Sequence, residues 1–135
     1  MSSFRVDMQA TKAHHARRTG CTCSYCRNFR KAYRQRPPLA AALLNTLGFD
    51  LDGDIEITDF SWNEARTLRV CEVVFPVKGR LEGDNIEYAF DDGTVVTLYQ
   101  PDSPELIYNN TDMQPPCFFA VLDMKAPWVL DETPD

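Results

Sequence analysis

The sequence predicts an α+β fold in which an N-terminal metal knuckle and two helices precede a curved antiparallel β-sheet. Residues 24–36 and 38–47 repeat apolar side chains with the period of an α-helix. After residue 54, short alternating runs separated by turn-forming residues predict a meander of five to seven strands. The 135 residues, 44% of them hydrophobic, are enough to bury the core of one domain.

The first 23 residues are expected to form one short strand followed by a loop. Residues 4–9 alternate apolar and polar side chains, which indicates a strand. Residues 10–23 are small, polar and basic, and they contain none of the apolar periodicity that a helix or strand needs. We therefore expect them to connect the strand to the first helix.

The first predicted helix begins at Ser24, whose side chain can serve as the N-cap. At about 100° per residue, an apolar stripe and a basic stripe lie on opposite sides of this helix. The apolar stripe, which we expect to be buried, contains Tyr25, Phe29, Ala32 and Tyr33. The opposite stripe, called the basic face below, contains Arg27, Arg30, Lys31 and Arg34.

The second predicted helix covers one face of the sheet. It spans residues 38–47, with Pro38 near its first turn and Gly48 positioned for a left-handed stop. One side of the helix is apolar and contains Leu39, Leu43, Leu44 and Leu47. Residues 50–54 then form a turn rich in aspartate.

The remaining sequence predicts the strands and turns of the sheet. Lys78-Gly79-Arg80 is expected to turn the chain, and Asp91-Asp92-Gly93 is expected to form a hairpin tip. The strand-like runs are residues 55–58, 67–77, 86–90, 94–99, 105–108 and 117–124, with residues 128–129 as a further candidate at an edge.

Charge divides the chain into two parts. Residues 1–36 have a net charge of +8 and residues 37–135 a net charge of −14, and Pro37-Pro38 marks the boundary between them. The basic part either docks on the chain's own acidic body or faces an external polyanion such as nucleic acid. We favour the internal interpretation because it needs no partner, and we expect the two parts to form one compact unit.

A cluster of cysteines is the most specific chemical signal in the sequence. Cys21, Cys23 and Cys26 form a C-x-C-x₂-C string just before the first helix, and His14 and His15 lie a few residues upstream. Zinc prefers four thiolate or imidazole ligands in a tetrahedron, so three sulfurs with His15 or His14 would make a structural site. Free cytosolic thiols and a redox pair are the alternatives.

The same string resembles a motif of a known family. The run from His15 through Cys21, Cys23 and Cys26 to Arg27-Asn28-Phe29, followed by a Leu-rich helix ending in Leu47-Gly48-Phe49-Asp50, is similar to a family of small, uncharacterised bacterial proteins. The resemblance covers roughly residues 14–60. It supports a metal site and implies no particular activity.

These observations favour a non-enzymatic, zinc-stabilised binding or adaptor module, whose basic face docks on an acidic surface. A protein partner is compatible with this interpretation. The alternatives are a metal- or thiol-dependent enzyme that uses the cysteines, and a nucleic-acid-binding protein that uses the basic segment. No nucleotide-binding or hydrolase motif is present. No run of about 20 apolar residues occurs, so we expect no membrane partner and a cytoplasmic location.

Overall fold

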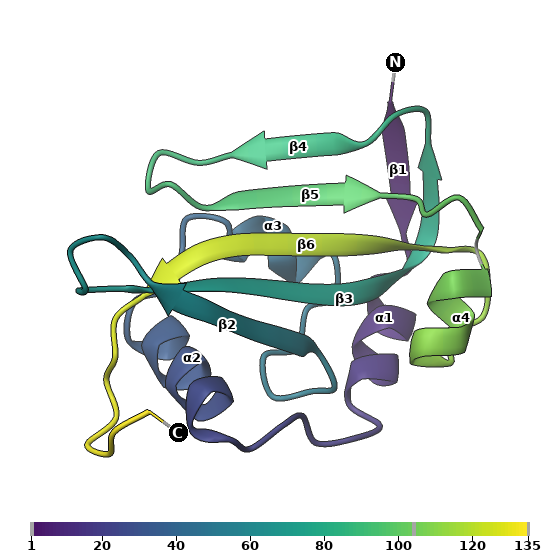
Figure 1. Cartoon of the computed structure of the whole chain (residues 1–135). Coiled ribbons are helices and arrows are strands. Elements are labelled where there is room, and N and C mark those ends of the chain that lie inside the picture. The colour runs from purple at the N-terminus through teal and green to yellow at the C-terminus, as the bar shows by residue number, and fades with distance from the viewer. Residues whose placement is uncertain (1, 104, 135) are drawn as a thin grey trace.

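The α+β class and the curved antiparallel sheet are confirmed by the computed structural model, which describes residues 2–103 and 105–134, with only the backbone at residues 108 and 109 (Figure 1). The described part contains, in chain order, β1 (Ser3–Val6), α1 (Met8–His15), α2 (Ser24–Gln35), α3 (Ala41–Thr46), β2 (Glu56–Trp62), β3 (Arg69–Glu82), β4 (Ile86–Ala89), β5 (Val95–Tyr99), α4 (Glu105–Thr111) and β6 (Cys117–Ala126). Within these residues no helix has the length and apolar character needed to cross a membrane.

Strand β3 organises the sheet. The strand order is β1-β3-β6-β5-β4, and β2 also pairs with β3; every pairing is antiparallel. Strands β4, β5 and β6 follow one another as a meander, but β6 then pairs with β3 from Lys78↔Cys117 to Arg69↔Ala126. The last strand thus joins the β2–β3 hairpin to the β4–β5 hairpin.

The predicted turn at Lys78-Gly79-Arg80 is wrong, because β3 continues through these residues. Gly79 pairs with Val6 of β1, and a Cβ atom at Gly79 would lie 1.9 Å from the carbonyl oxygen of Arg5. The glycine therefore permits a close approach of two backbones within the sheet. A glycine in the sequence does not distinguish a turn from a close approach of two strands, because both need a residue without a side chain.

The core lies on the inner face of the sheet, under α2 and α3. Odd-numbered residues of β3 point into it, and Val73, Phe75 and Val77 are fully buried. Phe29 of α2 and Leu44 of α3 belong to the same cluster. Since Phe29 lies in the basic part of the chain and Phe75 in the acidic part, one core contains side chains from both.

Two segments differ from the predicted secondary structure. Residues 8–15 are helical, although the sequence predicts a strand up to residue 9 and a loop after it, because the side chain of Asp7 caps α1 by accepting a hydrogen bond from the Ala10 amide at 2.9 Å. Residues 105–108 belong to α4 rather than to a strand. Residues 128–129 are not paired in the sheet.

The second helix is present but shorter than predicted. Helix α3 ends where Gly48 adopts a left-handed conformation with φ of 84°, as expected. Leu44 and Leu47 are fully buried, but Leu39 is 57% exposed. Leu39 precedes the regular helix, so its position does not follow the helical period that placed it on the buried face.

Candidate metal centre

The structure brings together the three cysteines of the C-x-C-x₂-C string. The Sγ atoms of Cys21, Cys23 and Cys26 all lie within 4.8 Å of one another. Cys21 and Cys23 are exposed in the loop before α2, whereas Cys26 lies in the first turn of α2 and is buried. Cys23, rather than Ser24, occupies the N-cap position, with extended backbone dihedrals.

This arrangement fits the geometry of a thiolate-bound zinc ion. Zinc–sulfur bonds of about 2.3 Å in a tetrahedron place the sulfurs roughly 3.8 Å apart, so the three side chains need only a small adjustment. The backbone amide of Cys23 donates a hydrogen bond to Sγ of Cys21 at 3.5 Å. The N-terminus of a 12-residue helix also favours negative charge on the nearby thiolates.

The thiols of the cluster differ in acidity because they differ in exposure. Hydrogen bonds from the backbone and side chain of Cys23 lower the pKa of Cys21. Burial, followed by contacts with Cys23 and Cys21, raises the pKa of Cys26 to about 12. A metal ion bound by all three sulfurs would have to displace the proton of Cys26, which makes its binding depend on pH.

Arg30 supports the cysteine loop from beneath, so its assignment to the exposed basic face is wrong. Its guanidinium is only 9% exposed and donates from Nε to the carbonyl of Leu51 at 2.9 Å and from Nη1 to the carbonyl of Cys21 at 2.5 Å. Gly20 leaves room for it, since a Cβ there would lie 2.2 Å from Nη2 of Arg30. The guanidinium fixes the loop and places a positive charge near the thiolates.

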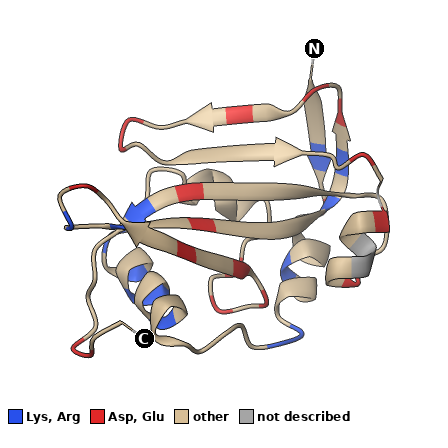
Figure 2. Ribbon diagram, viewed as in Figure 1, with Lys and Arg blue, Asp and Glu red and all other residues tan. Residues whose placement is uncertain are grey.

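The other members of the basic face are exposed. Arg27 forms an ion pair with Glu132, and Arg34 forms one with Asp52, whereas Lys31 is simply exposed to solvent. Figure 2 shows Lys and Arg along α2, and Asp and Glu along β2, β3 and β6. Basic side chains of α2 thus meet acidic side chains of the same chain.

His15 is not brought to the cluster. Its side chain is fully buried, donates from Nε2 to the carbonyl of Pro76 at 3.0 Å, and packs edge-to-face on Phe75 at 5.4 Å between ring centres. Burial lowers its pKa. These contacts make His15 a neutral core residue rather than the fourth ligand.

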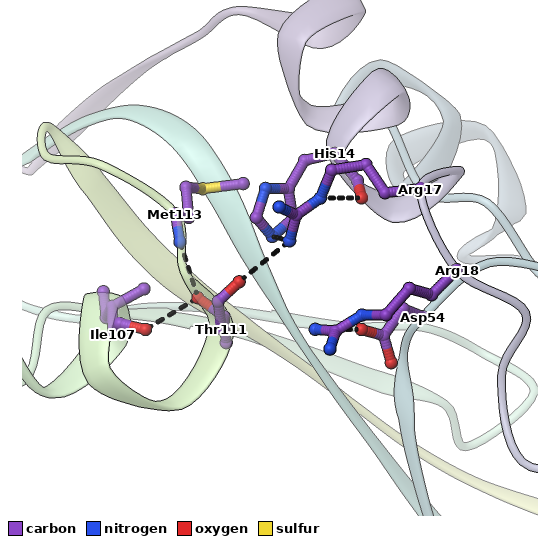
Figure 3. Close-up of polar contacts among 7 residues, drawn as sticks. All are labelled: His14, Arg17, Arg18, Asp54, Ile107, Thr111 and Met113. Carbon is purple, nitrogen blue, oxygen red and sulfur yellow. Dashed lines mark hydrogen bonds and ion pairs between the residues drawn. The ribbon is translucent and has the colours of Figure 1, made fainter.

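His14 lines the same groove as the cysteines but also lies outside the cluster. Its Nε2 is 3.2 Å from Nη2 of Arg17, and the same Nη2 donates to the carbonyl of Thr111 at 3.3 Å (Figure 3). Burial, followed by the charge of Arg17, lowers the pKa of His14. Among the described residues, the cluster therefore contains three cysteines and no imidazole.

The cluster opens onto a groove of about 880 Å³, which sequence reasoning missed. The groove runs from the cysteines over the edge strand β2 to the outer face of β3. Its lining consists of His14, Cys21, Cys23, Cys26, Asp54, Ile55, Glu56, Ile57, Thr58, Glu72, Val74, Pro76, Tyr99, Asn110, Thr111 and Phe119. The only sequence signal for it was the alternation in β3, which turns Glu72 and Val74 away from the core.

A buried ion pair attaches the first turn of α2 to the sheet. Arg69 is buried and donates from Nε to Oδ1 of Asp59 at 2.8 Å. Its guanidinium lies 4.7 Å from the ring centre of Trp62 and 5.4 Å from that of Tyr25. Because Tyr25 stands between Cys23 and Cys26, this stack positions the helix end that presents two of the three sulfurs.

Comparison of the chain with protein-family models, with curated proteins and with solved structures found no match. The fold and the cluster define an α+β chain with three convergent cysteines at the N-terminus of a helix.

Proposed function

We propose that this chain is a zinc-stabilised binding module without enzymatic activity, in which Cys21, Cys23 and Cys26 hold one zinc ion as thiolates. The observation that carries the proposal is the convergence of three sulfurs within 4.8 Å at the N-terminus of α2. Cys23 is the N-cap of α2 and Cys26 lies in its first turn, so the start of the helix holds both sulfurs close to that of Cys21.

The donor set selects the kind of metal. Thiolates are soft ligands and bind zinc or other thiophilic ions rather than calcium or magnesium, which prefer oxygen. An iron–sulfur cluster normally needs four cysteines. Cys71 and Cys117 are not available to complete one, because both are buried, Cys71 beside Asp59 and Cys117 beside the carbonyl of Met113.

The metal would order the segment that links α1 to α2. This segment is exposed at Cys21 and Cys23 and is attached to the body through Arg30 and the ion pair of Arg18 with Asp54, 2.8 Å long. Exposed ion pairs contribute little, about 0–1 kcal/mol each. A metal that joins Cys21 and Cys23 to Cys26 of α2 would therefore add rigidity to this segment beyond what Arg30 and the ion pair supply.

Elemental analysis of the purified chain after zinc loading and removal of excess metal tests the proposal. We expect about one zinc per chain, and a large loss in Cys23→Ser because two sulfurs bind zinc far more weakly than three. Cys117→Ala is the matched control, since it removes a cysteine outside the cluster and should retain the metal. A wild-type chain without bound zinc, or equal zinc in both variants, would refute the proposal.

The alternative of a thiol redox protein rests on one observation, the lowered pKa of the exposed Cys21 beside the buried Cys26. It predicts a Cys21–Cys26 disulfide after mild oxidation of metal-free protein, detected by a mass loss of two hydrogens, and a redox activity that zinc suppresses. The nucleic-acid alternative has less support, because Arg18, Arg27 and Arg34 are paired with acidic residues of the same chain.

A further inference from the structure

We propose that the fourth position of the bound metal opens into the groove and takes a small molecule that carries a thiolate at one end and a cationic group at the other. This inference rests on the proposed function, because it requires a metal on the three cysteines.

The number of ligands leaves one position for an outside donor. Zinc takes four ligands in a tetrahedral site, and the described residues place only Cys21, Cys23 and Cys26 in the cluster. His15 is held in the core by Pro76, and His14 is occupied by Arg17. The remaining donor is therefore water or a group on a bound ligand.

The groove beside the cysteines is large enough to hold a ligand that supplies this donor. All three cysteines line it, and its volume of about 880 Å³ lies within the usual range of roughly 300–1,000 Å³ for small-molecule sites. Across from the cysteines the lining is partly apolar, with Val74 on β3 and the packed rings of Tyr99 and Phe119, whose centres lie 5.5 Å apart. This surface can cover the carbon chain of a ligand.

The charge of the groove favours a cation. Glu56 on β2 and Glu72 on β3 both line it, and no ion pair involves either of them within the described part of the chain. Asp123 is the cross-strand neighbour of Glu72 and adds negative charge. The third lining carboxylate, Asp54, is compensated by Arg18.

The positive groups near the groove do not cancel this charge. Arg17 contacts His14 and the carbonyl of Thr111, and Arg30 lies beneath the loop, where its Nε and Nη1 donate to the carbonyls of Leu51 and Cys21. Burial and the neighbouring Asp123 raise the pKa of Glu72. The charge of the groove is therefore best measured at about pH 8, well above the ordinary glutamate pKa of about 4.3.

Cobalt(II) can replace zinc and report the fourth ligand through its visible absorption, which changes when the donor changes. The probes are cysteamine, 2-mercaptoethanol and 3-mercaptopropionate, which share a thiol and differ in the charge at the other end. We expect cysteamine to bind with a roughly five- to tenfold lower Kd than 3-mercaptopropionate, and 2-mercaptoethanol to lie between them.

A variant that lacks the two groove carboxylates separates the effect of the groove's charge on affinity from the effect of each thiol's own acidity. The ratio of the two affinities should fall by roughly fivefold in the Glu56→Gln, Glu72→Gln double variant. It should be unchanged in Glu87→Gln, an exposed carboxylate on β4 outside the groove. The preference should also weaken at high salt, because ionic screening reduces the attraction of exposed charges.

The outcomes distinguish the two proposals. If no cobalt–thiolate absorption develops on adding the metal, the three-cysteine site itself fails. If the absorption develops but none of the thiols changes it, the metal site stands and the open position is refuted. If the thiols bind with the same affinity ratio in wild type and double variant, the cationic preference is refuted.

Discussion

At the scale of single residues, the arrangement of the cysteine cluster depends on which side chains are buried in the protein and which are exposed to solvent. Cys26 is anchored in the core side of α2, while Cys21 and Cys23 stay exposed and can reach the same ion. Arg30 makes this possible, because its hydrogen bonds to the carbonyls of Leu51 and Cys21 fix the loop over the helix. A buried guanidinium with such partners is costly to remove, since the carbonyls then lose charge-assisted donors.

His15 is predicted to make the fold less stable as the pH falls. Burial lowers its pKa in the folded chain below the ordinary histidine value of 6.5. The unfolded chain therefore binds a proton first, and stability present above about pH 6.5 is lost as the pH decreases through that value. The slope from this one group is at most about 1.4 kcal/mol per pH unit.

Urea unfolding at about pH 7.5 and about pH 5.5, in the presence of a chelator, measures this effect without metal release. His15→Phe keeps an aromatic ring against Phe75 and cannot bind the proton, so its free energy of unfolding should change less with pH than that of the wild type. His14→Gln is the matched control on the same helix, and should retain most of the dependence because His14 is only partly buried. Equal dependence in wild type and His15→Phe would contradict the assignment.

At the scale of the elements, the spacing of apolar residues was sufficient to predict the secondary structure where the helix or strand is regular. The period of α2 predicted the burial of Phe29 and Tyr33, and the apolar run of residues 67–77 predicted β3 as a long strand. The patterns failed at α1, whose eight residues lack an apolar stripe, so that only the cap at Asp7 indicated it. They failed again at Arg30, because a long side chain can enter the protein from a polar position when carbonyl acceptors surround it.

Helix α3 and the residues before it allow a direct test of which leucines of the predicted apolar face are buried. Leu44 is fully buried and Leu39 is 57% exposed, although both belong to the same predicted apolar face. Leu44→Ala should reduce the free energy of unfolding by about 2–5 kcal/mol through the cavity that it leaves, whereas Leu39→Ala should change it by about 0.5 kcal/mol or less. Denaturant unfolding of both variants checks the difference, and equal losses would show that Leu39 is part of the core.

At the scale of the whole molecule, the charge division has a structural counterpart. The basic N-terminal part contributes Phe29 to the common core and places Arg18 and Arg34 against Asp54 and Asp52 of the acidic part. The groove lies where these parts meet the outer face of the sheet. Among the described residues, no ion pair involves its carboxylates Glu56 and Glu72, which gives this side of the molecule its negative character.

The metal site could be predicted only in part from sequence, for a physical reason. Cys21, Cys23 and Cys26 are close along the chain, so their spacing alone indicated that they converge. The fourth position depends on contacts over long sequence distances. His15 meets Pro76, 61 residues away, and Glu72 on β3 lines the same groove as the cysteines.

The central claim is that the three cysteine sulfurs bind one metal ion. X-ray absorption at the zinc edge of the zinc-loaded protein tests this claim directly. We predict three sulfur neighbours at about 2.3 Å and one lighter neighbour, oxygen or nitrogen, at about 2.0–2.1 Å. A zinc environment of oxygen and nitrogen alone, or of fewer than three sulfurs, would contradict the account.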